Sequence, residues 1–456
     1  MLRRCALRHV LRGPNARTIH TRTRQPRVSS HDIPFHTTTR KRPNIAQYAL
    51  SEKTQVRRLA TAAVPSILVP PLIFIGLLLG LWTWKCFWII VMQNKLLYIS
   101  WLPPFTRSEV ISDYEVECRP VKWEEKQIRS LDGTKLAVCE GRIPSSLKDR
   151  GSTPGIFASS SQNKESVGLK RKRSVVICYF QGNGGSTPMR LPLLSQVLRS
   201  ITEASKSTDG TTSDSGDAEF TIVALSYRGY WTSSGRATQS GIEMDAQAFL
   251  DWVSKTYAAP DTHLELVLWG HSLGAAVAST ATATYLPRHE DRSKSSSETS
   301  SGRPPPPISR LILEAPTSSV KDMLIALYPQ KWLPYRYMWP FSWNTWNIMA
   351  KMSEMAMWRD RGNSLARSES FVSGAMNPPP RSIPPIFLLA AEKDEVIPAY
   401  VPDQLEKQAK SLGMQIYRKD ALGAMHTEGP LKLDGRKAMV QFILHGTLVP
   451  KSIPSK

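Results

Sequence analysis

The chain has 456 residues, of which 41% are hydrophobic, so it can bury one large core with additional segments, and a wholly disordered or collagen-like protein is excluded. Lys and Arg number 59 against 38 Asp and Glu, a formal net charge of +21. Residues 1–58 alone hold 14 basic and 2 acidic side chains. Because no stripe of basic and aromatic residues follows this segment, we expect no nucleic-acid partner.

The five cysteines indicate neither a metal site nor a disulfide framework. None forms a Cys-x-x-Cys pair, and none clusters with histidine at metal-ligand spacing. We therefore expect buried free thiols, and no bound metal, at Cys5, Cys86, Cys118, Cys139 and Cys178.

The N-terminal segment, residues 1–58, is basic and rich in arginine. Its first 24 residues, MLRRCALRHVLRGPNARTIHTRTR, contain no acidic residue, and Leu7 and Leu11 are one helical turn apart. This pattern is typical of a mitochondrial presequence. It is equally typical of a disordered basic tail that orients a membrane helix, and both interpretations stay open.

A long apolar segment comes next. The 26 residues from Leu59 to Trp84 carry no charge, and about 20 residues of helix cross the hydrocarbon core of a bilayer. We predict one transmembrane helix within residues 64–92, starting near Pro70 because proline suits a first helical turn. The basic flank predicts an N-terminus in the cytosol or matrix, with the C-terminal part across the membrane.

Residues 113–450 alternate between short β-rich runs and helical patterns, which predicts an α/β domain with a mostly parallel sheet. An Asp132-Gly133 turn joins the first two strands as a hairpin. Between the fourth and fifth strands, apolar residues at helical spacing from Ile242 to Val253 predict a crossover helix with one buried face. The eight predicted strands are residues 126–130, 136–140, 175–180, 220–226, 264–269, 310–314, 386–391 and 414–418.

Four further segments interrupt this alternation. Residues near 144–173, 202–218 and 288–308 are rich in Ser, Lys, Asp and Pro, which cannot build a core, so we predict disordered insertions there. Residues 317–384 include LYPQKWLPYRYMWPFSWNTWNIMAKMSEMAMW, with five tryptophans. We predict a helical cap that holds an acyl chain or lies on the lipid interface; an ordinary packed helical pair is the alternative.

The pentapeptide Gly270-His271-Ser272-Leu273-Gly274 lies between an apolar strand and an apolar helical stretch. In such a nucleophile elbow the serine has a strained backbone, and flanking glycines are needed because a Cβ would collide with neighbouring elements. We expect Ser272 to be a nucleophile above the sheet, with the N–H of Leu273 pointing at a developing oxyanion. A serine that only caps the helix is the alternative.

A serine nucleophile needs a base, and three histidines follow Ser272 in the chain. His289 lies in a polar insertion, and His445 ends the last apolar helix, where it would complement the helix dipole. His426 lies in a loop a few residues beyond the last predicted strand. We therefore predict His426 as the general base.

The base in turn needs a carboxylate that fixes its tautomer. Asp394 closely follows the strand IFLLAA, at the sheet edge where the serine is expected. Glu395 and Asp420 are rivals, but neither combines a strand-end position with the turn that Val396-Ile397-Pro398 indicates. Asp394 is the predicted acid.

A second oxyanion donor is expected in the turn after the third strand, which reads Gln181-Gly182-Asn183-Gly184-Gly185. Glycines at this point let main-chain N–H groups approach a substrate oxygen. A glycine-rich turn by itself more often only reverses the chain, but this one falls where a donor is required. Asn183 is the predicted donor.

Together these residues make the chain resemble the α/β-hydrolase fold, and more narrowly the membrane-anchored α/β-hydrolase-domain lipases that act on lysophospholipids and monoacylglycerols. Nucleophile, acid and base follow in the order of such enzymes. The chain departs from the family at Gln181, where members usually have His, and at Trp231, where a small residue is common. The matching pieces, within about residues 174–445, are CYFQGNGG, ALSYRGYWTSSG, LWGHSLGAAVA, LILEAP, LLAAEKDEVIP and the His426 loop.

The resemblance implies an α/β-hydrolase fold with an eight-stranded, mostly parallel sheet, flanking helices, a helical cap and one preceding transmembrane helix. It implies a serine hydrolase that cleaves a carboxylic ester of a membrane lipid through an acyl-enzyme, without a metal or organic cofactor. An acyl-protein or acyl-CoA thioesterase, and a non-catalytic membrane scaffold of the same fold, are the alternatives. The resemblance favours the endoplasmic reticulum or other endomembranes, whereas the N-terminal segment favours mitochondria.

Overall fold

The computed structural model describes residues 65–144, 172–208, 218–259, 262–298, 306–373 and 380–448. The basic segment 1–58 and most of the predicted insertion 144–173 lie outside the described residues, so both remain predictions. The chain divides into two units, Met1–Gly76 and Leu77–Lys456, and the boundary falls inside helix α2.

Helix α2 (Val69–Val91) follows a short 3-10 turn at Ser66–Leu68 and contains no buried residue. The stretch Ser66–Val91 has a mean hydropathy of 2.0 and is long enough to cross a membrane. The predicted apolar helix and its start near Pro70 are therefore confirmed, and the helix suits a single membrane span. A five-residue helix, α3 (Gln93–Leu97), follows it.

A sheet of eight strands forms the centre of the second unit, in the order β1-β2-β4-β3-β5-β6-β7-β8. The β1–β2 and β2–β4 pairs are antiparallel, and all other neighbours are parallel. The strands are β1 (Lys122–Arg129), β2 (Lys135–Arg142), β3 (Lys172–Phe180), β4 (Glu219–Ser226), β5 (Thr262–His271), β6 (Ile308–Glu314), β7 (Ile386–Ala391) and β8 (Ile416–Ala421).

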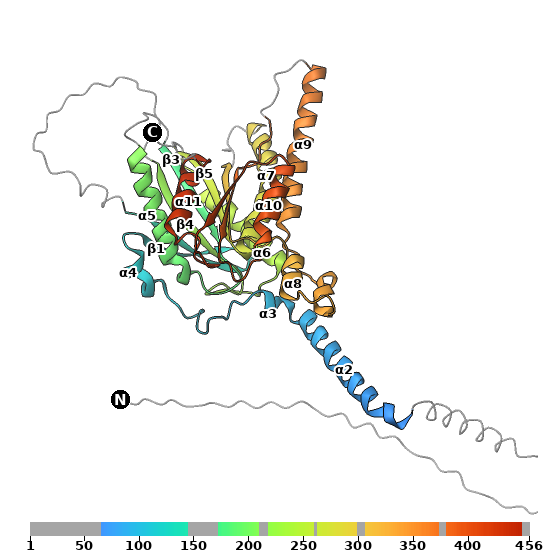
Figure 1. Ribbon diagram of the computed structural model, residues 1–456. Coiled ribbons are helices and arrows are strands. Elements are labelled where there is room, and N and C mark those ends of the chain that lie inside the picture. Colours follow the sequence, from blue (N-terminus) through green and yellow to red (C-terminus); the bar gives the residue numbers. More distant parts are fainter. Residues whose placement is uncertain are drawn as a thin grey trace, which may run out of the picture. The chain divides into compact units, whose positions relative to one another are not determined.

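Helices cover both faces of this sheet (Figure 1), because its central strands are apolar on both sides. In β3, Val176, Cys178 and Phe180 enter one core cluster, while alternate residues enter the other. The first cluster packs against α6, α7, α9 and α10, and the second against α5 and α11. The helices are α4 (Glu115–Cys118), α5 (Leu191–Thr208), α6 (Gln239–Thr256), α7 (Leu273–Glu298), α8 (Val320–Leu327), α9 (Ile348–Ser373), α10 (Tyr400–Ser411) and α11 (Leu433–His445).

Two predicted insertions are partly wrong, because helices extend into them. Helix α5 continues to Thr208, since Ile201 is fully buried on its apolar face even though the following residues are mostly polar. Helix α7 continues to Glu298, with Arg288 donating to Gln247 on α6. Residues 209–217 and 299–305 lie outside the described part of the chain.

The last strand also begins later than predicted. Met414 donates its main-chain N–H to Ala409 and so completes the end of α10, and β8 starts only at Ile416. Only a few residues separate the helical pattern that ends in Leu412-Gly413 from β8. The sequence therefore does not show where the turn ends and the strand begins.

The predicted cap region contains α8, two 3-10 turns at Pro334–Tyr337 and Trp339–Phe341, and helix α9. Its aromatic and methionine side chains divide between two roles. Trp346, Met352 and Met355 belong to the main core, as the packed-helix alternative expected. The tryptophans that are largely exposed are Trp332, Trp339 and Trp343.

Candidate active site

Ser272 lies between the end of β5 and the start of α7, in a backbone conformation with φ of +55°. This left-handed conformation is strained for a residue with a side chain. The glycines beside it are sterically required. A Cβ on Gly270 would lie 2.2 Å from the oxygen of Gly274, and a Cβ on Gly274 would lie 2.0 Å from the oxygen of Phe180. The elbow therefore forms as its sequence predicts.

Three predicted site residues from three different loops come together. His426 Nε2 lies 2.9 Å from Ser272 Oγ, and His426 Nδ1 lies 2.9 Å from Asp394 Oδ2. Asp394 is itself held in place, because its Oδ1 accepts main-chain N–H groups from Val396 and Ile397. Since a carboxylate only accepts, Nδ1 carries the hydrogen and Nε2 is free to accept the serine proton.

The rival carboxylates have other partners. Glu395 Oε2 accepts the main-chain N–H of His426 at 3.0 Å, so it supports the loop and not the imidazole. Asp420 pairs with Arg418 on the outside of β8. Of the three acidic candidates, only Asp394 contacts the histidine ring.

The turn after β3 packs directly against the serine. A Cβ on Gly182 would lie 3.6 Å from the Cβ of Ser272. The main-chain oxygen of Asn183 accepts two hydrogen bonds, from the N–H of Ile99 and the hydroxyl of Tyr230, both at 2.9 Å. On the other side, Leu273 is the first residue of α7, where an N–H has no acceptor within the helix. The turn after β3 and the start of α7 thus both adjoin Ser272, and the roles of Asn183 and Leu273 as oxyanion donors stay predictions.

Gln181 and Trp231, the two residues that depart from the family pattern, are both buried and both form hydrogen bonds. Gln181 accepts the hydroxyl of Thr187 through its side chain and the hydroxyl of Tyr227 through its main chain. Its Nε2 atom has no hydrogen-bond partner among the described residues. Trp231 donates its indole N–H to the main-chain oxygen of Glu109. The two bonds of Gln181 hold the turn after β3 without the histidine that is usual at this position in the family.

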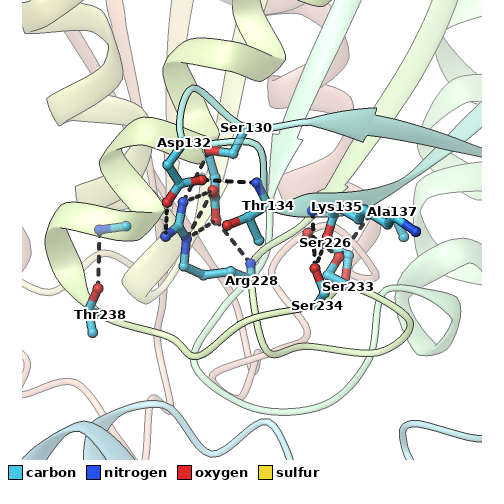
Figure 2. A network of polar contacts seen from close by, with 12 residues as sticks. Ser130, Asp132, Thr134, Lys135, Ala137, Ser226, Arg228, Ser233, Ser234 and Thr238 are labelled. Carbon is cyan, nitrogen blue, oxygen red and sulfur yellow. Dashed lines mark hydrogen bonds and ion pairs between the residues drawn. The ribbon is translucent and has the colours of Figure 1, made fainter.

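The loop that carries Tyr227 and Tyr230 is anchored by a buried ion pair. Arg228 reaches Asp245 on α6 at 2.7 Å and Asp132 in the β1–β2 turn at 2.7 Å. Figure 2 shows the Arg228 side chain between Ser130 and Asp132, at the end of the hairpin. This network positions the two tyrosines beneath the oxyanion turn.

A second buried network was missed by the sequence analysis. Glu314, at the end of β6, accepts from Arg190 at 3.0 Å and from the indole of Trp269 at 2.8 Å, while its main-chain oxygen accepts the N–H of Ser272. Arg190 also donates to the main-chain oxygen of Thr427. Burial raises the pKa of Glu314, although the charge of Arg190 opposes this. The pair links the serine elbow to the histidine loop.

His271 completes this layer. Burial, and then the positive charge of Arg190, hold its pKa well below the usual 6.5, so its ring is neutral. Its Nε2 lies 3.3 Å from the main-chain oxygen of His426. The only sequence signal for these contacts was the place of His271 inside the pentapeptide.

Thiols and acidic or imidazole side chains provide no metal site in the described ranges. No group of three or more His, Cys, Asp or Glu is arranged there to hold a metal ion. Cys118, Cys139 and Cys178 are buried free cysteines as expected, whereas the expected burial of Cys86 is wrong, because it lies on α2, which contains no buried residue. Burial raises the pKa of each of the three.

A cavity of about 1060 Å³ opens between the cap region and the loop that carries Asp394. Its lining reaches Asn183 of the oxyanion turn and Asp394 of the histidine loop. Most of the remaining lining is apolar and comes from the cap region and from the segment that follows Trp88. A site of this kind suits a substrate with a large apolar part.

The chain is similar to proteins of the alpha/beta hydrolase family. A profile of the alpha/beta hydrolase family matches residues 211–419, a range that includes Ser272 and Asp394 and ends before His426. The alpha/beta hydrolase domain-containing protein WAV2 of Arabidopsis thaliana is 26% identical over 245 residues, which are 54% of this chain and 58% of that protein. Protein bem46 of Schizosaccharomyces pombe is 27% identical over 153 residues, 34% of this chain and 38% of that protein.

The human protein ABHD12B is 35% identical over 65 residues, 14% of this chain and 17% of that protein. Each match therefore spans less than two thirds of the relative's length. Among solved structures, the Pyrococcus furiosus esterase Pf2001 is 13% identical, with a TM-score of 0.39 over 74% of this chain and 93% of that one. An alpha-beta hydrolase from Vibrio vulnificus gives 13% identity and a TM-score of 0.43 over 77% of this chain and 89% of that one.

The strand order, the serine elbow and the family profile identify the fold. An antiparallel β1–β2 hairpin, the β2-β4-β3 crossover and a serine elbow after β5 all occur here in one sheet. The chain therefore has the α/β-hydrolase fold, and it resembles the α/β-hydrolase-domain proteins.

Proposed function

We propose that this protein is a membrane-anchored serine hydrolase that cleaves the carboxylic ester of a lipid of the lysophospholipid or monoacylglycerol type. One observation carries the proposal: the continuous path from Asp394 through His426 to Ser272, in which each hydrogen bond measures 2.9 Å. Such a path activates the hydroxyl of a serine that lies in a strained turn at the start of a helix.

The first half of the reaction transfers the acyl group to the enzyme. His426 Nε2 takes the hydroxyl proton of Ser272 while Oγ attacks the carbonyl carbon of the ester. The N–H groups of Leu273 and Asn183 stabilise the negative oxygen of the tetrahedral intermediate. His426 then gives its proton to the leaving alcohol as the ester C–O bond breaks, and Asp394 stabilises the imidazolium between these two transfers.

The second half releases the fatty acid. Water loses a proton to His426 Nε2 as its oxygen attacks the acyl carbon, and the same oxyanion site holds the second tetrahedral intermediate. Collapse of this intermediate breaks the bond to Ser272 Oγ, which regains its proton from His426. The cycle leaves the enzyme unchanged and needs only water as co-substrate.

The choice of a lipid ester has its own support. Helix α2 is apolar except for Lys85 near its C-terminal end, and none of its residues is buried. The cavity that reaches Asn183 and Asp394 is lined mostly by apolar side chains. An enzyme with an apolar site close to a membrane anchor is suited to a substrate that partitions into the bilayer.

A fluorophosphonate probe tests the proposal, since it reacts with an activated serine. Membrane fractions that contain the intact protein are labelled, with Ser272→Ala and His426→Ala as comparison variants. We expect labelling of the intact protein and its loss in both variants, because the second variant lacks the base. Monoacylglycerol, lysophospholipid and palmitoyl-CoA then compete for the labelled site.

Folded intact protein that does not label would contradict the hydrolase proposal and favour the scaffold alternative. Labelling that palmitoyl-CoA prevents more strongly than either glycerol ester would assign a thioester substrate to the same triad. Competition by the glycerol esters is the result we expect.

A further inference from the structure

The cavity that reaches Asn183 and Asp394 is built from three separate parts of the chain. One wall belongs to the end of α2 and to α3, a second belongs to α8 and the 3-10 turns of the cap, and the floor belongs to the oxyanion turn and the loop after β7. Its volume of about 1060 Å³ slightly exceeds the roughly 300–1,000 Å³ typical of small-molecule sites. The apolar residues of the first two walls include Ile89, Ile90, Leu96, Leu97, Val320, Met323, Leu324, Leu327, Met338 and Phe341.

The first wall is bonded firmly to the second. Gln93 donates to the main-chain oxygen of Phe341 at 3.2 Å and accepts the N–H of Trp343 at 2.7 Å. Asn344 donates to Asn94 at 2.7 Å. Figure 1 shows α3 beside the cap turns that follow α8. Hydrogen bonds between α3 and the cap therefore hold the first two walls of the cavity together.

These polar pairings leave an apolar interior. The side chains of Gln93 and Asn344 line the cavity, yet each is already engaged with a neighbour across the interface. The main-chain oxygen of Asn183 accepts the N–H of Ile99, which lies two residues beyond the end of α3. One short stretch of chain thus contacts both the cap and the oxyanion turn.

The rim of the cavity is apolar and open to the surroundings. Leu96 on α3 is 58% exposed, Leu327 on α8 is 69% exposed, and Phe341 in the cap is 59% exposed. These three apolar side chains come from three elements and line one cavity. Their exposure to water is unfavourable in free energy, whereas their contact with lipid is favourable.

The rim is also close to the expected surface of the bilayer. At 1.5 Å per residue, the 26 residues Ser66–Val91 extend about 39 Å, which exceeds the roughly 30 Å of a hydrocarbon core. Trp84 and Trp88, residues of a type enriched at membrane interfaces, lie in the last turns of α2, which places these turns in the headgroup region. Lys85 lies there with its ammonium group 4.7 Å from the ring centre of Tyr335, another residue of the lining.

We propose that this cavity is an acyl-chain site that a lipid enters sideways from the bilayer, with the end of the membrane helix as one of its walls. The chain of the lipid passes the rim at Leu96, Leu327 and Phe341. Its ester group then passes Asn183 to reach Ser272, which does not itself line the cavity. This inference rests on the proposed function, and it adds the acyl site, the direction of entry and a role for α2 in substrate recognition.

The test compares two esters in full-length protein reconstituted into phosphatidylcholine vesicles. p-Nitrophenyl butyrate is short enough to need little of the cavity, whereas p-nitrophenyl palmitate must fill it. Ile90→Trp on α2 and Leu324→Trp on α8 each place a larger side chain in the lining. We expect kcat/KM for palmitate to fall by roughly tenfold or more in both variants, with butyrate changed by less than about twofold.

Two matched variants control for the added tryptophan. Leu81→Trp changes another residue of α2 that is exposed and does not line the cavity, and Leu433→Trp changes an exposed residue at the start of α11. Both are expected to keep the palmitate to butyrate ratio of the unmodified protein. An equal fall for both esters in Ile90→Trp and Leu324→Trp, or no fall for palmitate, overturns the inference.

A second measurement needs no cavity variant. A long-chain alkyl fluorophosphonate with a diazirine at its tail is attached to Ser272 in the vesicles and then photolysed. Cross-links to peptides from residues 89–97 or 320–330 are expected, and cross-links confined to other regions or to lipid overturn the inference. If the unmodified protein neither labels at Ser272 nor hydrolyses butyrate, the proposed function itself fails, which is a distinct result.

Discussion

The hydroxyl of Tyr230 donates a hydrogen bond of 2.9 Å to the main-chain oxygen of Asn183, a residue 47 positions earlier in the chain. That oxygen also accepts the N–H of Ile99. With its carbonyl held from two sides, the peptide group that joins Asn183 to Gly184 cannot rotate freely, which restricts the backbone of Asn183 and so the direction of its own N–H. Preorganised donors of this kind stabilise an oxyanion without reorganising during the reaction.

Tyr230→Phe is therefore expected to lower kcat for p-nitrophenyl butyrate by roughly three- to tenfold, because one neutral hydrogen bond contributes about 1 kcal/mol. KM is expected to stay unchanged, since Tyr230 positions the turn and does not touch the substrate. The matched control is Tyr285→Phe, which removes a similar bond to Pro306 far from the site. Equal losses of kcat in the two variants would show that Tyr230 has only a structural role.

Asp394→Asn tests the assignment of the acid. An amide at this position can no longer accept from Nδ1 in the same way and does not stabilise an imidazolium, so we expect kcat to fall by roughly a thousandfold or more. Asp420→Asn is the control, because Asp420 pairs with Arg418 on the outside of β8. Turnover of p-nitrophenyl butyrate measures both, and a larger loss in Asp420→Asn would reverse the assignment.

Asp245→Asn tests the network under the oxyanion turn. Asp245 and Arg228 are both buried, and removing one partner of a buried pair leaves an uncompensated charge. We expect the free energy of unfolding to fall by about 3–5 kcal/mol. Asp132→Asn provides the contrast, because the Asp132 side chain is 35% exposed and such pairs contribute about 1 kcal/mol or less. Denaturant unfolding that gives similar losses for both variants would contradict this distinction.

The sequence predicted those features of the site that depend on local geometry. Gly270 and Gly274 are required because any Cβ there meets backbone atoms, so the pentapeptide carries its own structure. Asp394 and His426 could be placed because the carboxyl ends of parallel strands meet at one sheet edge. Their catalytic roles stay predictions, and the experiments above address them.

The contacts between distant segments could not be predicted. Nothing in one sequence links Tyr230 to Asn183 or Arg190 to Glu314, because their positions depend on how loops pack after the sheet has formed. Composition was also misleading in α7. Its polar end is helical, and Glu290 there pairs with Arg381 at 2.6 Å, a partner 91 residues away that no local pattern indicates.

The neutral ring of His271 makes the folded state sensitive to acid. Burial and Arg190 hold its folded pKa well below 6.5, while the unfolded chain has the ordinary value, so below about pH 6.5 the unfolded state binds a proton that the folded state does not. Stability is therefore lost as the pH falls, by up to about 1.4 kcal/mol per pH unit. The raised pKa of Glu314 contributes a slope of opposite sign, so the effect of His271 is measured as a difference between proteins.

We expect His271→Gln to have a flatter loss of Tm between pH 6.5 and 5 than the unmodified protein. His263→Gln removes an exposed histidine and is expected to leave the slope as it is; identical slopes in all three proteins would show that His271 is not the acid-sensitive group.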